Sequence, residues 1–458
     1  MKTESQTPVS MADMPLGRRQ ISIVLIASLG QFIGQGLATL VGIVIPLMQL
    51  ATHPGLLAGL QGLMGCISLI GIMLGTVVFG RLSDRYGYLL FFRLCPLIIA
   101  VASLVAAFVH TVAVILVCLF LMGFAIGGEY SLDPDYISEL MPTRWRVYMV
   151  GVAKALASAG SAFVAAVCYF DIVHRGNPDD WSSLFLIITA IAALMLLLRL
   201  GFAQSPQWLM SRGRKAEAEA AVRRLLGPDA VMDPEPKTVV HAPARQSMWQ
   251  FIRQNTAKII LTGVPWACEG LGVYGIGIFL PVLIMSFHLD SLPATATRLQ
   301  HITHSVGLTF VLCLVMMVGF AGGLMMLRRV NHLRLQTVGF WMSAVGLGVL
   351  MAAYLGSWPA WIAIAGFVVF EIFLNAGPHL ITFILPSQTY PVDDRGTGSG
   401  IAAGIGKSGA VIGAFIIPML LKWGGATLVL IVSISVMVLG ALVTTLMGRI
   451  VTKTDKEI

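Results

Sequence analysis

The sequence predicts an all-α membrane protein in which twelve transmembrane helices form two pseudo-symmetric six-helix bundles. First, 57% of the 458 residues are hydrophobic and 11% are charged, whereas soluble domains carry about 25% charged residues. Second, the apolar residues gather into twelve long runs, and third, the two halves of the chain repeat one polar pattern. This composition excludes a soluble enzyme, a nucleic-acid-binding module and a disordered scaffold.

The first half of the chain holds six of these apolar runs. About 20 helical residues cross the hydrocarbon core of a bilayer. Charged residues, prolines and glycines separate the runs, which lie near 21–46, 58–80, 88–109, 112–134, 147–170 and 182–202. The first run lacks a small-residue cleavage site, so we expect an uncleaved span rather than a secretory signal. We therefore predict a cytoplasmic segment, 1–20, and an N-terminal bundle, 21–203.

A polar linker, residues 204–256, separates the two groups of runs. Its segment SPQWLMSRGRKAEAEAAVRRLL places apolar residues at helical spacing opposite arginines and glutamates, which predicts an amphipathic helix lying on the cytoplasmic face. The proline-rich stretch 233–237 should end that helix. A C-terminal bundle, 257–448, and a cytoplasmic tail, 449–458, follow, with runs near 257–285, 302–327, 334–355, 359–384, 398–421 and 426–448.

The distribution of lysine and arginine predicts the orientation, because cytoplasmic loops of membrane proteins are enriched in both. With both termini cytoplasmic, 24 of the 30 lysines and arginines lie on the cytoplasmic side. Only Arg175, Arg298 and Lys422 lie on the other side. Basic loops beside anionic lipid explain the net charge of +8 without any nucleic-acid partner.

The chain carries no motif of enzymatic chemistry, metal binding or cofactor binding. There is no metal-ligand spacing, no glycine-rich phosphate loop ending in GK[ST] and no nucleophile elbow, so we expect no enzyme, no metal and no cofactor. The cysteines all fall inside apolar runs and are expected to be packing residues; they are Cys66, Cys95, Cys118, Cys168, Cys268 and Cys313.

The two halves repeat at an offset of 249 residues. The pattern Glu-x-x-Pro-x-x-x-Arg at 139–146 becomes Gln-x-x-Pro-x-x-x-Arg at 388–395. The same offset relates three glycine pairs, which are Gly128 and Gly377, Gly151 and Gly400, and Gly160 and Gly409. Paired six-helix halves are typical of secondary transporters, whose solute site lies between the halves near mid-membrane.

The chain resembles the Major Facilitator Superfamily of transporters over nearly its whole length. The segment GRLSDRYG, 80–87, resembles the superfamily's loop between helices 2 and 3, and residues 323–329 resemble a second copy that has lost its acid. The segment SPQWL, 205–209, followed by Gly-Arg at 213–214, resembles the signature of sugar, organic-ion and phosphate porters. The resemblance implies that Asp84 accepts hydrogen bonds that lock the cytoplasmic side in one state.

Several short segments of the chain resemble those of phosphate:proton symporters and related metabolite:proton symporters. The resemblance rests on Trp266 and on GGEY at 127–130, YG at 274–275, NAGP at 375–378, YP at 390–391 and GKSGA at 406–410. Three positions depart from that branch. The helix 1 aspartates are absent from QFIGQG, the helix 7 aspartate falls on Gly270 beside Glu269, and the helix 5 glutamine falls on Ala157. These departures argue against phosphate itself as the solute.

Polar residues deep in the apolar runs are the candidate site, because a charge in the bilayer core costs roughly 3 kcal/mol or more. At 1.5 Å per residue, Glu129 lies about 15 Å and Lys407 about 18 Å from the cytoplasmic ends of their helices, with Glu269 at similar depth. We expect Glu129 and Glu269 to couple protons. We expect the solute to contact Lys407, Trp266, Gln31, Gln35, Asn375, Tyr274 and Glu371.

Structural roles compete with these functional ones. Glu129 or Glu269 can be a neutral, hydrogen-bonded carboxyl, and Lys407 can belong to a permanent ion pair with either. Glu371, Asn375 and His379 follow each other at intervals of four and can form a polar packing seam.

Charged residues at the cytoplasmic ends of the runs are predicted to form a gate, namely Asp84, Arg85, Glu139, Arg146 and Arg395. Two basic residues inside the runs are given structural roles. We expect Lys154 to pair with Asp135 or Glu139, and we expect the Arg199 side chain to extend to the membrane interface.

The favoured function is secondary active transport of a small, polar, anionic metabolite by alternating access, as proton-coupled symport across the plasma (inner) membrane. The predicted partners are the solute, protons and membrane lipid, and a single chain is sufficient. The first alternative is a polyspecific drug or metabolite exporter that works by proton antiport. The second, a non-transporting membrane sensor, is less favoured because the gate residues are present.

Overall fold

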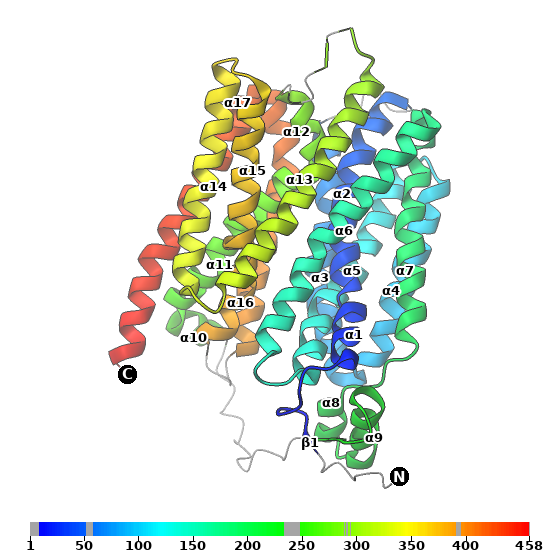
Figure 1. The fold of residues 1–458 in the computed structure, drawn as a ribbon, viewed down its shortest axis with the longest axis vertical. Helices are drawn as coiled ribbons and strands as arrows, with labels where there is room; N and C mark the ends of the chain where they lie inside the picture. The colour runs from blue at the N-terminus through cyan, green and yellow to red at the C-terminus, as the bar shows by residue number, and fades with distance from the viewer. Residues whose placement is uncertain are drawn as a thin grey trace, which may run out of the picture.

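The structure is a computed structural model that describes residues 9–51, 58–232, 248–287, 289, 292–293, 295–390 and 395–457. Long helices stand side by side along the long axis of the molecule (Figure 1). The first helix begins and the last helix ends at the same end of the molecule, which we call the terminal end.

The first bundle consists of the N-terminal helices. Most of them are 20 to 30 residues long, because long apolar runs form them. The helix α6, for example, ends at Gly176, whose φ of +62° favours glycine. The elements are α1 (Arg18–Ala27), α2 (Leu29–Ala51), α3 (Ala58–Tyr86), α4 (Tyr88–Phe108), α5 (Val112–Leu140), α6 (Arg146–Arg175), the 3₁₀ helix η1 (Pro178–Leu184) and α7 (Phe185–Arg199).

The second bundle contains helices with breaks at membrane depth. Its first span joins α11 (Thr256–Gly270) to a π-helical segment, η2 (Leu271–Ile276), before α12 (Leu280–Ser286). Its other elements are α13 (Arg298–Met326), α14 (His332–Leu355), α15 (Ala360–Ala376), α16 (Pro378–Thr389) and α17 (Arg395–Glu457). A capping box between Thr297 and Gln300 starts α13, and the Asn331 side chain caps α14.

The predicted number of crossings is consistent with the helix lengths. In the described part of the chain, 11 helical segments are long and apolar enough to span a membrane. The last of them, Gly398–Val451, has 54 residues. It is interrupted by non-helical backbone at Gly424 and Gly425, so it holds the last two predicted runs. The all-α membrane fold predicted from the sequence is therefore confirmed.

The break between α15 and α16 lies beside the candidate site. Gly377 has φ −113° and ψ −90°, and Pro378 begins the next helix, because proline lacks the amide hydrogen that would continue the previous one. Irregular backbone at membrane depth is found where it lines a cavity or is covered by protein. This break and the π-helical segment η2 are such places.

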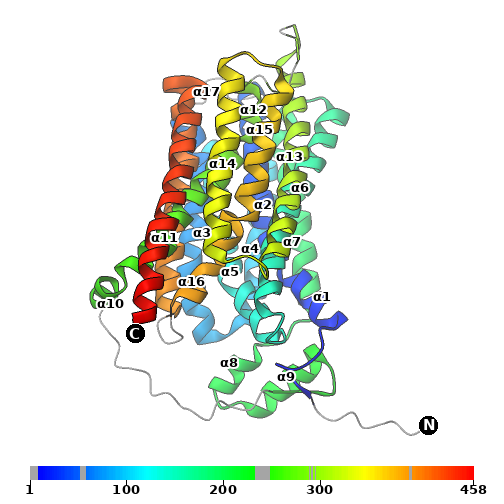
Figure 2. The same ribbon diagram turned by 60° about the vertical axis from the view of Figure 1, so that its left-hand side comes forward.

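The linker forms a small subdomain at the terminal end, below the N-terminal bundle (Figure 2). It contains α8 (Pro206–Ser211), α9 (Lys215–Leu226) and strand β2 (Ala230–Val231), which pairs in parallel with β1 (Val9–Ser10). The amphipathic pattern does form a helix, α9. Its apolar face is covered by α8, β2 and α1 rather than left for lipid. Residues 233–237 lie outside the described residues, and α10 (Met248–Gln254) leads into the second bundle.

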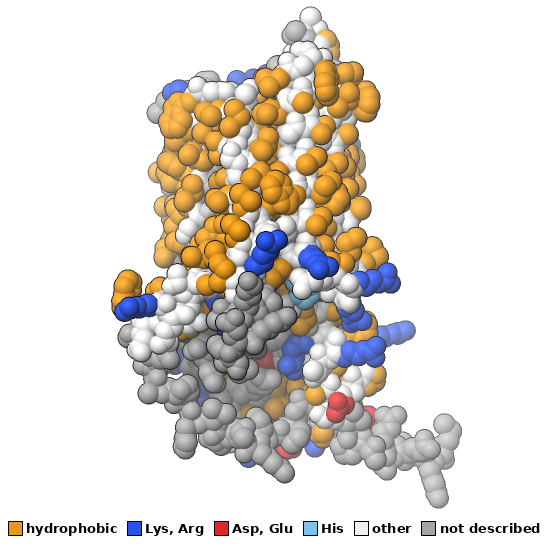
Figure 3. Space-filling model, turned by 90° about the vertical axis from the view of Figure 1, so that its left-hand side faces the viewer, with side chains coloured by type: hydrophobic (Ala, Val, Ile, Leu, Met, Phe, Trp, Pro, Cys, Tyr) orange, Lys and Arg blue, Asp and Glu red, His pale blue; other side chains and the backbone are white. Residues whose placement is uncertain are grey.

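The surface separates into an apolar belt and a basic end. Hydrophobic side chains cover the length of the bundles, while lysine and arginine side chains gather toward the terminal end (Figure 3). All six cysteines are buried and free, as predicted for packing residues.

Candidate functional site

A cluster of charged and phenolic side chains lies between the two bundles, and we call it the central cluster. It consists of Tyr130 from α5, Lys154 from α6, Glu269 from α11, Tyr274 from η2 and Lys407 from α17. The Lys407 ammonium lies 4.5 Å from the centre of the Tyr130 ring and 4.8 Å from that of Tyr274. The Lys154 ammonium lies 5.2 Å from the same Tyr130 ring. The two tyrosine hydroxyls are 3.1 Å apart.

Glycines in GKSGA bring α17 close enough to α11 to build this cluster. A methyl group at Gly406 would lie 2.6 Å from the Trp266 ring, so the ring packs on the glycine next to Lys407. A methyl group at Gly409 would overlap the carbonyl oxygen of Ala267. The close helix contact thus packs the Trp266 ring on the residue before Lys407, within the same bundle.

The charges of the central cluster do not balance. Neither ammonium forms an ion pair with a carboxylate of the described residues; their close contacts are aromatic rings and the Tyr274 hydroxyl. Glu269 is within electrostatic range of both lysines, and its carboxyl oxygen lies 3.6 Å from Nε2 of His379. Two ammonium groups, one buried (Lys154) and one half-buried (Lys407), therefore share one carboxyl group, which makes the region attractive to an anion.

A row of polar side chains runs along α15 and α16 into the central cluster. The Asn375 amide nitrogen donates to the Glu371 backbone oxygen at 2.7 Å and to its carboxylate at 3.1 Å. The Asn375 amide oxygen is 2.9 Å from His379 Nδ1. His379 Nε2 lies 3.6 Å from Glu269 Oε1. The predicted shared face of these residues is confirmed, and the row joins Glu371 to Glu269.

The glutamines of helix 1 lie buried on α2. Gln35 and Glu371 line one enclosed cavity of about 20 Å³ between the bundles, together with Thr39, Ser161 and Thr309. Both polar atoms of the Gln31 amide and the Gln35 amide oxygen have no hydrogen-bond partner among the described residues. Buried amides without partners are costly, so these groups are available to a solute or to water.

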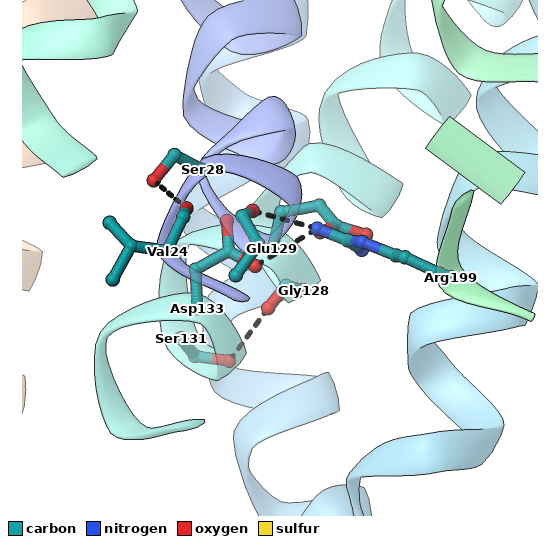
Figure 4. A network of polar contacts seen from close by, with 8 residues as sticks. Val24, Ser28, Gly128, Glu129, Ser131, Asp133 and Arg199 are labelled. Atoms are coloured by element: carbon teal, nitrogen blue, oxygen red, sulfur yellow. Dashed lines mark hydrogen bonds and ion pairs between the residues drawn. The ribbon is translucent and has the colours of Figure 1, made fainter. Parts of the chain in front are cut away.

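Glu129 lies in a separate, fully buried ion cluster with Asp133 and Arg199 (Figure 4). Arg199 Nη1 is 2.5 Å from Glu129, and its Nη2 is 3.2 Å from Asp133 and 2.8 Å from the Ala27 carbonyl oxygen. The absence of a side chain at Gly30 leaves room for Glu129, since a methyl group there would lie 2.5 Å from the Glu129 Cβ. Glu129 therefore does not join Lys407, although the two lie at similar depth.

Two predictions about basic residues are wrong. Arg199 does not extend to the membrane interface; it is fully buried, because two carboxylates and the Phe92 ring, 4.7 Å away, hold it inside the N-terminal bundle. Lys154 pairs with neither Asp135 nor Glu139; its ammonium contacts the rings of Tyr130 and Phe383. Sequence reasoning therefore missed Lys154 as a site residue, because the repeat offset of 249 residues relates it to Ala403 and not to Lys407.

At the terminal end, the linker is fastened to the first bundle through the predicted gate. Ser205 donates to the Glu139 carboxylate at 2.5 Å. The Gln204 amide oxygen accepts from the backbone nitrogens of Tyr88 and Leu89 at 2.8 and 3.1 Å. Gly87, with φ +84°, lies against that amide, where a larger residue would not fit. Gln204 and Ser205 were not predicted as gate residues.

Of the other predicted gate residues, the structure describes the side chains of Arg85 and Arg146. The Arg85 carbonyl oxygen accepts from Arg212 of the linker at 3.3 Å, while its guanidinium lies 5.3 Å from the Tyr86 ring. Arg146 lies within electrostatic range of Glu139. The side chains of Asp84 and Arg395 lie outside the described residues, so their roles stay predictions.

The two bundles also contact each other away from the central cluster. At the terminal end, the Arg328 guanidinium lies 4.8 Å from the Trp145 ring and 5.3 Å from the Tyr148 ring. Toward the opposite end, Gly42 lies so close to the Ile278 carbonyl that a methyl group would overlap it.

Comparison with known proteins shows the family to which this chain belongs. The family described as "Sugar (and other) transporter" matches residues 16–453. The inner membrane metabolite transport protein YgcS of Escherichia coli is 27% identical, with 96% of this chain and 93% of the relative covered. The putative inorganic phosphate transporter 1-13 of Oryza sativa is 25% identical, with coverage of 76% and 73%.

Among solved structures, the chain is similar to the xylose transporter XylE of E. coli in a partially occluded, inward-open conformation. The TM-score is 0.74 at 21% identity, covering 93% of this chain and 97% of that one. The family and these relatives are transporters and not enzymes. The chain belongs to the sugar (and other) transporter family, and its fold is similar to that of XylE, which is described as a major facilitator superfamily protein.

Proposed function

We propose that this transporter moves a small anionic metabolite together with protons by alternating access of a site between its two bundles. The observation that carries the proposal is the pair of ammonium groups at the Tyr130 ring, one from each bundle, of which Lys154 is buried and Lys407 half-buried. An ammonium in the membrane interior is expensive unless a counter-charge is near. A solute anion supplies that counter-charge, and it draws the bundles together because Lys154 and Lys407 belong to different halves.

The proposed solute site extends from these lysines to the neutral groups around them. Trp266 offers a flat apolar wall beside Lys407. Tyr274 adds a hydroxyl, and Gln31 and Gln35 add amide atoms that lack partners among the described residues. Asn375 and Glu371 would complete the lining on the other bundle, where Glu371 shares a cavity with Gln35.

Glu269 is proposed to couple protons to this site. When Glu269 is ionised, it neutralises one of the two ammonium charges and competes with the solute anion. When Glu269 is protonated, both ammonium charges are left to the solute. Proton and anion would therefore bind together, which is symport. A related transporter, XylE, is described as a proton:xylose symporter, which supports this mode.

Glu129 remains a second proposed proton-binding group. Its cluster contains two carboxyls and one guanidinium, all fully buried. Arginine stays protonated in proteins, so it neutralises one carboxylate and leaves the other to bind a proton. Glu129 would then act on transport from inside the N-terminal bundle rather than by touching the solute.

Orientation, gate and location are proposed from the charge distribution. Both termini are assigned to the cytoplasm, because basic side chains gather at the terminal end. Asp84, Arg85, Glu139, Arg146 and Arg395 would then form the cytoplasmic gate, with the linker fastened to it through Ser205. We assign the protein to the plasma (inner) membrane. We also propose that a single chain is sufficient for transport. The small, charged, enclosed region favours a small anion over the bulky cargo of a polyspecific exporter.

Ligand-induced thermal stabilisation of the purified protein tests the charge of the solute. The probes are inorganic phosphate, nicotinate, gluconate and succinate, with D-xylose as the neutral comparison. We expect at least one anion to raise Tm in the wild type, and Lys407→Ala and Lys154→Ala to abolish that rise. Lys422→Ala, at an exposed position, is the matched control and should keep it. Stabilisation by D-xylose alone, unaffected by Lys407→Ala, would contradict the proposal.

A further inference from the structure

The orientation of the Asn375 amide is fixed by its neighbours. Its nitrogen lies 2.7 Å from the Glu371 backbone oxygen and 3.1 Å from the Glu371 carboxylate. A backbone carbonyl oxygen can only accept hydrogen bonds, so the atom facing it must be the amide nitrogen. The amide oxygen of Asn375 is consequently the atom presented to His379 one turn later.

The amide oxygen in turn fixes the tautomer of His379. Nδ1 of the imidazole lies 2.9 Å from Asn375 Oδ1, and an amide oxygen can only accept. Nδ1 must therefore carry a hydrogen. A neutral imidazole has one N–H, so Nε2 of neutral His379 is a bare acceptor.

That bare nitrogen faces a carboxylate oxygen. His379 Nε2 and Glu269 Oε1 are 3.6 Å apart, and both side chains are buried. Neither atom has a hydrogen-bond partner among the described residues. The separation is longer than a hydrogen bond, as expected for two acceptors with no proton between them. One proton, placed between the two atoms, would satisfy both.

We propose that Glu269 and His379 form one proton-binding unit, in which protonated Glu269 donates to Nε2 of His379 and the Asn375–Glu371 pair holds the acceptor tautomer. The proposal rests on the proposed proton coupling at Glu269 and gives His379 a role that the sequence left open. The proton comes from water, joins Glu269 and later returns to water, so no other bond forms or breaks.

The groups around the unit decide which of its atoms holds the proton. Lys154 from α6 and Lys407 from α17 face it, with Tyr130 from α5 and Tyr274 from η2 beside them. Glu371 lies beyond Asn375, and the Phe320 ring of α13 packs 5.0 Å from the imidazole. The two ammonium groups oppose a positive imidazole, so the proton belongs to the carboxyl.

This arrangement explains how a neutral carboxyl can persist between two ammonium groups. The ammonium groups by themselves favour ionised Glu269, whereas the acceptor on His379 favours the protonated form. Proton binding then removes the one negative charge near the lysines and makes room for an anion. His379 thereby sets the pH at which the solute site becomes available.

Infrared difference spectroscopy during pH titration tests the unit without any solute. The purified full chain in lipid is titrated while the absorbance of protonated carboxyl groups is recorded. We expect the wild type to show a step that Glu269→Gln abolishes. His379→Phe should move that step by at least one pH unit to lower pH, because the phenyl ring offers the protonated carboxyl no acceptor nitrogen. His304→Gln, at an exposed position of α13, should leave it unchanged.

Nitrogen-15 spectra of histidine-labelled wild-type protein provide a second readout that needs no folded variant. We expect a neutral Nδ1–H imidazole whose Nε2 signal responds at the same pH as the carboxyl step. The absence of any step that Glu269→Gln removes, a midpoint of that step unmoved by His379→Phe, or the absence of such an imidazole would overturn the proposal. Anion-induced stabilisation alongside any of these results would leave the proposed function standing. A titrating pair without anion stabilisation would instead reject the proposed function.

Discussion

At the residue scale, the sequence predicts how deep a polar group lies but not which neighbour it faces. Lys407, Tyr274 and Glu269 could be brought together from motif spacing and depth, because their helices face the other bundle. Lys154 and Arg199 were misassigned, because depth along one helix carries no information about its rotation. Glu129 and Asp133 lie four residues apart on α5, and such a pair of acids on one helix face in an apolar run indicates a buried cation between them.

The ion cluster makes a stability prediction at this scale. Replacing Arg199 by methionine leaves two carboxyls buried without a cation, which should destabilise the protein by about 3–5 kcal/mol. The triple change Arg199→Met, Glu129→Gln, Asp133→Asn removes the charges together and should recover most of the loss. Unfolding in mild detergent measures both, with the exposed Arg298→Met as the control. A fully stable Arg199→Met protein would mean that the cluster is not ionised.

At the scale of elements, helix positions were predictable and helix breaks were not. Long apolar runs located the spans, because each must satisfy its own backbone inside the membrane. The break between α15 and α16, and the π-helical segment η2, depend on packing against other helices. The amphipathic pattern predicts that α9 is a helix. It does not predict that α8, β2 and α1 cover the apolar face, because an apolar stripe packs equally well on protein or on lipid.

Close packing of α11 on α17 gives the prediction at this scale. A methyl group at Gly409 would overlap the Ala267 carbonyl, whereas one at Gly404 meets no atom within 4 Å. Gly409→Ala should therefore cost about 1–3 kcal/mol through overpacking, and it should weaken anion binding by moving Lys407. Gly404→Ala on the same helix should be neutral or stabilising, since alanine favours helix. Equal melting temperatures for the two variants would show that this contact is not tight.

At the scale of the whole molecule, the family and the paired bundles followed from composition, motifs and the repeat. What the sequence could not predict is which faces of the bundles meet, since that depends on all the helices at once. Arg328 between Trp145 and Tyr148 is one such contact, formed by three residues that lie in different halves. The contact of Gly42 on Ile278 is another.

Proton-driven accumulation in proteoliposomes tests the central claim most directly. Uptake of a labelled anion that stabilises the protein is followed with an acidic exterior. The wild type should concentrate the anion inside until a protonophore collapses the gradient. Glu269→Gln should exchange the anion but reach only equal concentrations, and Glu129→Gln should behave in the same way if its cluster also couples. Accumulation that survives the protonophore, or that Glu269→Gln retains in full, would contradict proton-coupled transport through the central cluster.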